Sequence, residues 1–180
     1  MCSSNDHSHC HLRRKFLTLS GGLLLTSLFP GEIKANAPTI DLPRPGPRDV
    51  CPVCGMFVAK YPDWVASILF QDGHVDHFDG AKDFFKYIMD LKKYAQGRTK
   101  EDIVGMGVTD YYEVKLIDAT KALYVVGSDV YGPMGHEFIP HPTQADADEF
   151  YKDHKGKRIL TFENITKALV YNLDEGIFQG

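Results

Sequence analysis

A proline-rich segment divides this chain of 180 residues into two parts of different character. Proline fixes φ and has no backbone N–H, so neither a helix interior nor a central strand can run through residues 38–48. The prolines in question are Pro38, Pro43, Pro45 and Pro47. We therefore expect an extended linker over residues 38–48, with little regular structure, and a folded part that starts near residue 49.

Residues 1–37, which precede this linker, have the features of an export signal. Arg13 and Arg14 stand directly before a short apolar stretch, residues 16–29, that is interrupted by glycines. Paired arginines before such a stretch are typical of twin-arginine signals, with a general secretory signal as the alternative. The sequence therefore predicts export to the periplasm.

The end of the signal is marked by small residues. Ala35 and Ala37 supply an A-x-A cleavage pattern, but Pro38 should hinder cleavage directly after Ala37. We expect processing one or two residues away, or an uncut signal that keeps the protein associated with the membrane. No cysteine follows the apolar stretch directly, so we expect no lipid attachment there.

The charge balance and the number of cysteines exclude some classes of binding partner and of fold. Acidic side chains outnumber basic ones by 24 to 20, giving a formal net charge of -4. This balance argues against nucleic acid, or an anionic membrane surface, as the main partner. Of the four cysteines, two fall in the expected signal, which leaves too few for a disulfide-stapled scaffold.

Hydrophobic periodicity after residue 49 predicts an α+β fold. Strands are expected over residues 64–70, 75–78, 104–108, 112–118, 123–127, 137–139 and 158–162. Helices are expected over residues 81–91, from 142 to the glycine at 156, and over 165–173, with Asp79 as the N-cap of the first. This order fits two small, similar α+β units of strand-strand-helix-strand type, packed side by side. The first unit would cover residues 49–100 and the second residues 101–180.

The candidate chemistry of the first unit lies in a C-x-x-C-G-M motif over residues 51–56. A C-x-x-C pair alone fits a redox dithiol, half of a zinc site, a soft-metal site or an ordinary disulfide. A four-thiolate zinc site is excluded because the chain after the signal has no second cysteine pair. A thioredoxin-type motif would lie between a strand and a helix, whereas here a linker precedes it and a strand follows.

Methionine favours the soft-metal interpretation. If the chain is extended, Met56 and Cys54 lie on one side of it, with alpha carbons about 7 Å apart. Thiolate and thioether together favour Cu(I) over zinc or calcium. Met134-Gly135-His136 repeats this spacing in the second unit with a thioether and an imidazole. The candidate metal ligands are therefore Cys54, Met56, Cys51, Met134 and His136.

Several short motifs, taken in order, resemble a known family. They are Cys54-Gly55-Met56, Phe70-x-Asp72-Gly73, Phe78-Asp79-Gly80, Tyr124-Val125-Val126-Gly127 and Pro133-Met134-Gly135-His136-Glu137. Over roughly residues 48–170 the chain resembles NosL, the accessory protein of nitrous-oxide reductase. The resemblance implies two similar small α+β domains, akin to those of organomercurial lyase. It also implies Cu(I) binding at Cys54 and Met56, with Met134 as a further contributor.

The same resemblance implies a role and a partner. Family members are periplasmic Cu(I)-binding proteins that help to deliver copper to apo nitrous-oxide reductase, and another copper enzyme or a membrane maturation complex is a further candidate partner. Many members are lipoproteins, whereas this chain shows a twin-arginine signal, and Cys51 is a thiol that not every member has. The leading hypothesis is a non-enzymatic metallochaperone. The alternatives are a periplasmic thiol-disulfide oxidoreductase using Cys51 and Cys54, and a metal-storage or sensing module.

Overall fold

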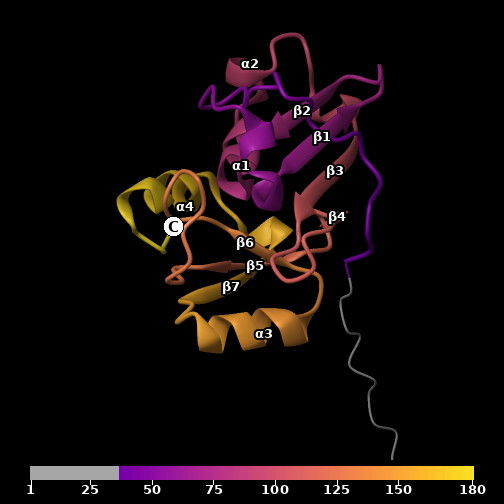
Figure 1. Cartoon of the computed structure of the whole chain (residues 1–180). Coiled ribbons are helices and arrows are strands. Elements are labelled where there is room, and N and C mark those ends of the chain that lie inside the picture. The colour runs from indigo at the N-terminus through magenta and orange to yellow at the C-terminus, as the bar shows by residue number, and fades with distance from the viewer. Residues whose placement is uncertain (1–36) are drawn as a thin grey trace, which may run out of the picture. The chain divides into compact units, whose positions relative to one another are not determined.

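The computed structural model describes residues 37–180, which belong to one compact unit of the chain. The predicted signal, apart from Ala37, lies outside these residues. Within the described part, no helix has both the length and the apolarity needed to cross a bilayer. Helices and two antiparallel sheets make up the fold, which confirms the predicted α+β class (Figure 1).

The first sheet has the strand order β2-β1-β3-β4. Its strands are β1 (Ala66–Phe70), β2 (Val75–Phe78), β3 (Ile103–Thr109) and β4 (Leu116–Asp118). Helix α1 (Ala81–Met89) and the short helix α2 (Leu91–Tyr94) connect β2 to β3. The turn between β1 and β2 contains Gly73, whose φ of +83° suits glycine and whose N–H bonds to Phe70 O at 2.9 Å.

The second sheet has the strand order β6-β5-β7. It consists of β5 (Leu123–Val126), β6 (Ile139–His141) and β7 (Arg158–Thr161). Helix α3 (Gln144–Asp153), capped by the Thr143 side chain, connects β6 to β7, and α4 (Lys167–Asn172) follows β7. The 3₁₀ segments are Val58–Lys60, Pro62–Trp64, Lys100–Asp102, Phe162–Asn164 and Leu173–Glu175.

Both sheets repeat one topology. The first strand of each repeat, β1 or β5, lies in the middle, with its hairpin partner on one side and the strand that follows the helix on the other. The boundary expected at residue 100 comes too early for this pairing, because residues 103–118 form β3 and β4 of the first sheet. The third strand of the first repeat, β3, lies after residue 100 and therefore outside the expected first unit. The division into two units as such stays a prediction.

Helix α1 provides the largest part of the core. Phe84 and Phe85 are fully buried, at the helical spacing that the sequence predicts. The Phe85 ring packs edge-on against Tyr124 and Phe138 of the second half, with ring centroids 5.1 Å apart in each case. These aromatic contacts hold α1 between the residues of the first sheet and those of the second sheet. The N-terminal turn of α1 is therefore held where the two sets of residues meet.

The segment expected to be a linker begins as part of the fold. Residues 37–45, which we call the N-terminal strap, start with an extended stretch beside β4, where Thr39 pairs with Ile117. Ile40 donates its N–H to Leu116 O at 3.0 Å, and the strap's Ala37 is buried. Proline is compatible with an edge position of this kind because the missing N–H faces away from the ladder.

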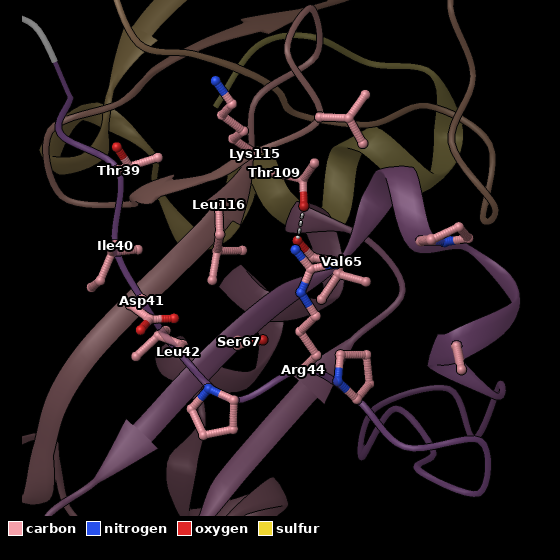
Figure 2. Close-up of a pocket in the computed structure, with 15 residues that line it drawn as sticks. Thr39, Ile40, Asp41, Leu42, Arg44, Val65, Ser67, Thr109, Lys115 and Leu116 are labelled. Carbon is pink, nitrogen blue, oxygen red and sulfur yellow. Dashed lines mark hydrogen bonds between the residues drawn. The ribbon is translucent and has the colours of Figure 1, made fainter.

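A pocket of about 380 Å³ lies between the strap and the first sheet (Figure 2). Strap residues line one side of it, and Val65, Ser67, Thr109 and Leu116 line the other. Thr109 does not offer its hydroxyl proton to the pocket, because Oγ1 donates to Val65 O at 2.7 Å. None of the candidate metal ligands lines this pocket.

Candidate metal centre

The C-x-x-C-G-M motif forms a closed turn. Cys51 N–H bonds to Met56 O and Gly55 N–H bonds to Cys51 O, each at 2.8 Å, and Val50 pairs with Phe57 at the base of the loop. Gly55 has a φ of +79°, a left-handed conformation that favours glycine. The extended geometry expected for Cys54 and Met56 is therefore wrong. That expectation depended on the alternating side-chain directions of an extended chain. The main-chain hydrogen bonds within the motif fold this stretch into a turn, so the alternation does not apply.

The turn brings both thiols to two carboxylates instead. Cys51, Cys54, Asp79 and Asp83 each offer one ligand atom, and these four atoms all lie within 4.8 Å of one another. Asp79 directly follows β2, and Asp83 lies in the first turn of α1. We call these four residues the thiol–carboxylate cluster. Among the described residues it is the only such group of three or more His, Cys, Asp or Glu side chains.

Each thiol has its own acceptor in the cluster. Cys54 Sγ donates to Asp79 Oδ1 at 3.2 Å, and Cys51 Sγ donates to Asp83 Oδ2 at 3.5 Å. Asp79, Asp83 and Cys51 are buried, whereas Cys54 is half-buried. The two sulfur atoms therefore differ in access, and Cys54 is the one nearer to solvent.

Burial keeps the thiols protonated when no cation is bound. Desolvation raises the pKa of Cys54 to about 12, and the neighbouring carboxylates of Asp79 and Asp83 act in the same direction. Desolvation and the nearby carboxylates raise the pKa of Cys51 well above its usual range. Both effects oppose negative charge on sulfur, so a cation that neutralised this charge would favour the thiolates.

The carboxylates leave acceptor capacity unused. Asp79 Oδ2 and Asp83 Oδ1 are buried and have no hydrogen-bond partner among the described residues, although Lys86 Nζ lies 3.5 Å from Asp83 Oδ1. Buried carboxylate oxygens without partners are costly in a folded protein. Two soft sulfurs and two such oxygens at one place fit a bound metal cation, and the sulfurs fit Cu(I) in particular.

Of the other predicted ligands, the two methionines stay predictions and His136 lies outside the cluster. Met56 is half-buried at the end of the cysteine turn, and Met134 is 43% exposed. His136 is outside the thiol–carboxylate cluster, and its ring packs against Tyr131 and Phe178 with centroids 4.8 and 5.0 Å away. The structure therefore joins the two cysteines and does not join His136 to them.

Met134 and His136 are also not arranged as expected. Gly135 between them has a φ of +86°, so this stretch is a turn and the extended spacing predicted for it is wrong. The turn nevertheless lies close to α1, because Lys82 Nζ donates to Met134 O at 2.8 Å. Lys82 directly precedes Asp83 of the cluster.

Two site residues were missed from the sequence. Asp79 was expected to cap α1, but Gly80 is the N-cap, no side chain caps it, and Asp79 bonds to a thiol. Asp83 was not singled out at all. No local pattern in the sequence signals either carboxylate, because Asp79 precedes the N-cap of α1 and Asp83 lies within the helix.

Known proteins resemble this chain over most of its described length. A family model described as NosL matches residues 44–170. The copper-binding lipoprotein NosL of Stutzerimonas stutzeri is 30% identical over 131 residues, which cover 68% of this chain and 64% of that protein. The matched region thus spans less than two thirds of the relative's length.

A solved structure has a similar fold. The crystal structure of the copper chaperone NosL from Shewanella denitrificans matches 73% of this chain and 99% of that one, with a TM-score of 0.60. The two sequences are 24% identical, so this likeness concerns the fold alone.

Proposed function

Because this chain belongs to the NosL family, we propose that it is an exported metallochaperone whose cargo, Cu(I), binds at Cys51 and Cys54. The observation that carries the proposal is the thiol–carboxylate cluster, in which two thiols and two buried carboxylates meet within 4.8 Å. The name of the Stutzerimonas stutzeri relative, a copper-binding lipoprotein, supports the same cargo. A chaperone of this kind converts no substrate into a product and is not an enzyme.

The cluster offers a route for the thiol protons. Cu(I) binds thiolate, so each cysteine must lose its proton when the cargo arrives. Asp79 lies 3.2 Å from Cys54 Sγ and Asp83 lies 3.5 Å from Cys51 Sγ, so each leaving proton has an acceptor within hydrogen-bond reach.

Release to a client depends on access to the sulfur atoms. Cys51 is buried and Cys54 is half-buried, so an incoming client ligand would approach Cu(I) from the Cys54 side. Cu(I) with few ligands leaves room for such an attack, and the ion then passes by ligand exchange without being free. We propose apo nitrous-oxide reductase or another copper enzyme as the client, met in the periplasm, and a membrane maturation complex as a further partner.

The burial of the cysteines counts against the oxidoreductase alternative. Reactive C-x-x-C cysteines have a lowered thiol pKa, because the thiolate is the nucleophile. Here the pKa of each thiol is raised by burial and by the neighbouring carboxylates. The motif also precedes a 3₁₀ segment and β1 and does not begin a helix.

Anaerobic titration of the reduced protein with Cu(I), against a competing chelator, tests the proposal. We expect one Cu(I) per chain, a sulfur-dominated first shell in X-ray absorption, and much weaker competition from Zn(II). Since the turn places both sulfurs in the cluster, Cys51→Ser and Cys54→Ser should each lower the affinity by at least about tenfold, or 1.4 kcal/mol.

Met56→Leu is the matched variant, because it keeps both thiols and nearly the same side-chain volume. Loss of Cu(I) affinity in it would place the Met56 thioether in the site, and unchanged affinity would assign Met56 to packing. A first shell made only of oxygen and nitrogen would contradict the proposed function.

A further inference from the structure

The ligands of the thiol–carboxylate cluster do not select one metal on every count. The softness of the sulfurs favours Cu(I), but Zn(II) also binds cysteine sulfur and carboxylate oxygen, and the cluster offers two of each. Ligands that are all negatively charged when they bind favour a divalent cation, because Coulomb attraction is proportional to the charge of the ion. A fixed positive charge beside the cluster would therefore shift the preference toward the monovalent ion.

A lysine ammonium group lies at the edge of the cluster. Lys86 Nζ is 3.5 Å from Asp83 Oδ1, and the other oxygen of the same carboxylate, Oδ2, accepts from Cys51 Sγ at 3.5 Å. The Asp83 carboxylate therefore lies between a thiol and the ammonium group. Because Lys86 follows Asp83 by three residues in α1, the helix itself places the two side chains on one face.

A second carboxylate holds this ammonium group from the other side. Asp174, in the 3₁₀ segment Leu173–Glu175, lies 2.8 Å from Lys86 Nζ and also pairs with Lys82 Nζ at 3.0 Å. The Lys86 side chain is 11% exposed, and the two neighbouring carboxylates favour its charged form. The fold therefore sets both the place and the charge of the ammonium group before any metal binds.

From these contacts we propose that Lys86 is a specificity-determining residue, whose positive charge makes the thiol–carboxylate cluster prefer monovalent Cu(I) to divalent Zn(II). The inference rests on the proposed function, and it adds a second cause of selectivity to the softness of the sulfurs. Lys86 itself touches no metal. Its repulsion of a bound ion doubles when the charge of the ion doubles, so Lys86 weakens Zn(II) binding more than Cu(I) binding.

The ratio of the Cu(I) affinity to the Zn(II) affinity tests this role. Both are measured on the reduced protein without oxygen, at one pH, by competition with chelators of known affinity. Both metals displace the same thiol protons, so the cost of removing these protons cancels in the ratio. Lys86→Met should lower the ratio at least about threefold. Lys86→Arg, which keeps the positive charge, should leave the ratio unchanged.

Lys167→Met is the matched control. Lys167 also pairs with a carboxylate, that of Asp90 at 3.2 Å, and its Nζ lies 5.9 Å from the centroid of the Tyr171 ring, as does that of Lys86. Its ion pair does not involve a carboxylate of the cluster, so its loss should leave the ratio unchanged. The double variant Cys51→Ser and Cys54→Ser is the blank, because any Zn(II) that it still binds lies outside the cluster.

Asp174→Asn gives a shift of the opposite sign and keeps the test decisive if Lys86→Met does not fold. The Asp174 side chain is 38% exposed, so an amide can replace its carboxylate without a buried charge being left behind there. The change removes a negative charge that compensates Lys86, and the ammonium group keeps its contact with Asp83. The positive charge acts more strongly on a bound ion in this variant, so the ratio should rise.

Three outcomes would overturn the role of Lys86. An unchanged ratio in Lys86→Met would mean that the sulfurs alone select the metal. An equal fall in Lys167→Met would mean that the ratio follows the net charge of the protein, and a fall in Asp174→Asn would have the wrong sign. Each of these results leaves Cu(I) binding by the cysteines intact. Failure of the native protein to bind Cu(I) would instead overturn the proposed function.

Discussion

At the scale of single residues, His141 is the side chain whose burial is least compensated. It is fully buried at the end of β6, and neither ring nitrogen has a hydrogen-bond partner among the described residues. Its neighbours are rings, with Phe150 at 4.8 Å and Tyr111 at 6.2 Å between centroids. Desolvation lowers the pKa of His141 from its usual 6.5 to about 4, although Asp146 acts in the opposite direction.

This burial makes the protein sensitive to acid. Between pH 6.5 and pH 4 the unfolded chain binds a proton at His141 and the folded chain does not, so stability falls as the pH falls through this window. His141→Met keeps the volume and removes the titration. In urea unfolding, the free energy of unfolding of the native protein should drop relative to that of His141→Met by up to about 3 kcal/mol between pH 7 and pH 4. Parallel pH profiles for the two proteins would contradict this.

The residue scale is also where prediction from sequence was least complete. Cys51 and Cys54 were identified because a C-x-x-C pair is a local pattern. Asp79 and Asp83 join them only through the packing of α1 against the cysteine turn, and no periodicity records such a contact. The extended geometry expected around Gly55 was wrong because a single left-handed glycine reverses the chain.

At the scale of elements, the contact between the strap and β3 depends on two glycines. A Cβ on Gly107 would lie 2.7 Å from Leu116 and 3.1 Å from Ile40 of the strap. A Cβ on Gly105 would meet Leu42 at 3.2 Å, which a flexible side chain tolerates more easily. The strap can lie so close to the sheet because β3 has no side chains at these positions.

Because a Cβ at Gly107 would be more crowded than one at Gly105, we expect Gly107→Ala to destabilise the protein more than Gly105→Ala. Gly107→Ala should lower the free energy of unfolding by about 1–3 kcal/mol through overpacking, and Gly105→Ala by less than about 1 kcal/mol. Urea unfolding measures both, and limited proteolysis should cut the strap faster in Gly107→Ala only. Equal losses would indicate that the strap moves aside freely and contributes little.

Most helices and strands could be predicted because their hydrophobic residues recur with a clear periodicity. The strand over 75–78 has the expected bounds, and α1 ends two residues earlier than expected, at Met89. The strand expected over 112–118 is shorter, because Asp110 accepts from Glu113 N–H and Val114 adopts a positive φ of 52°. Such local turns break a strand whose composition alone suggests that it continues.

At the scale of the whole molecule, the route of export can be tested independently of the fold. Arg13 and Arg14 lie outside the described residues, and the twin-arginine signal remains a prediction. Replacing both by lysine should leave the precursor in the cytoplasm, as measured by cell fractionation, because the paired arginines are the recognition element. Lys15→Gln is the control, since it changes a neighbouring charge and should leave export intact. Unchanged export of the double variant would indicate the general secretory route.

The repeat in the fold could be predicted only in part. The order of strands and helices indicated two similar units, but the sequence could not show that β3 and β4 complete the first sheet. That assignment depends on pairing between strands far apart in the chain, Ala66 with Val108 for example. Pairing of this kind follows from the folded arrangement and leaves little trace in local composition.

The strap also determines how the molecule would carry a mechanical load. Ala37 bonds to Pro142 O beside the second sheet, at 2.7 Å, and Pro38 O accepts from Asp118 of the first sheet at 2.9 Å. Tension applied at Ala37 would therefore be shared between the two sheets before it reached the cysteines. A protein held or pulled at this end would keep its thiol–carboxylate cluster undistorted, because the force leaves the chain before Cys51.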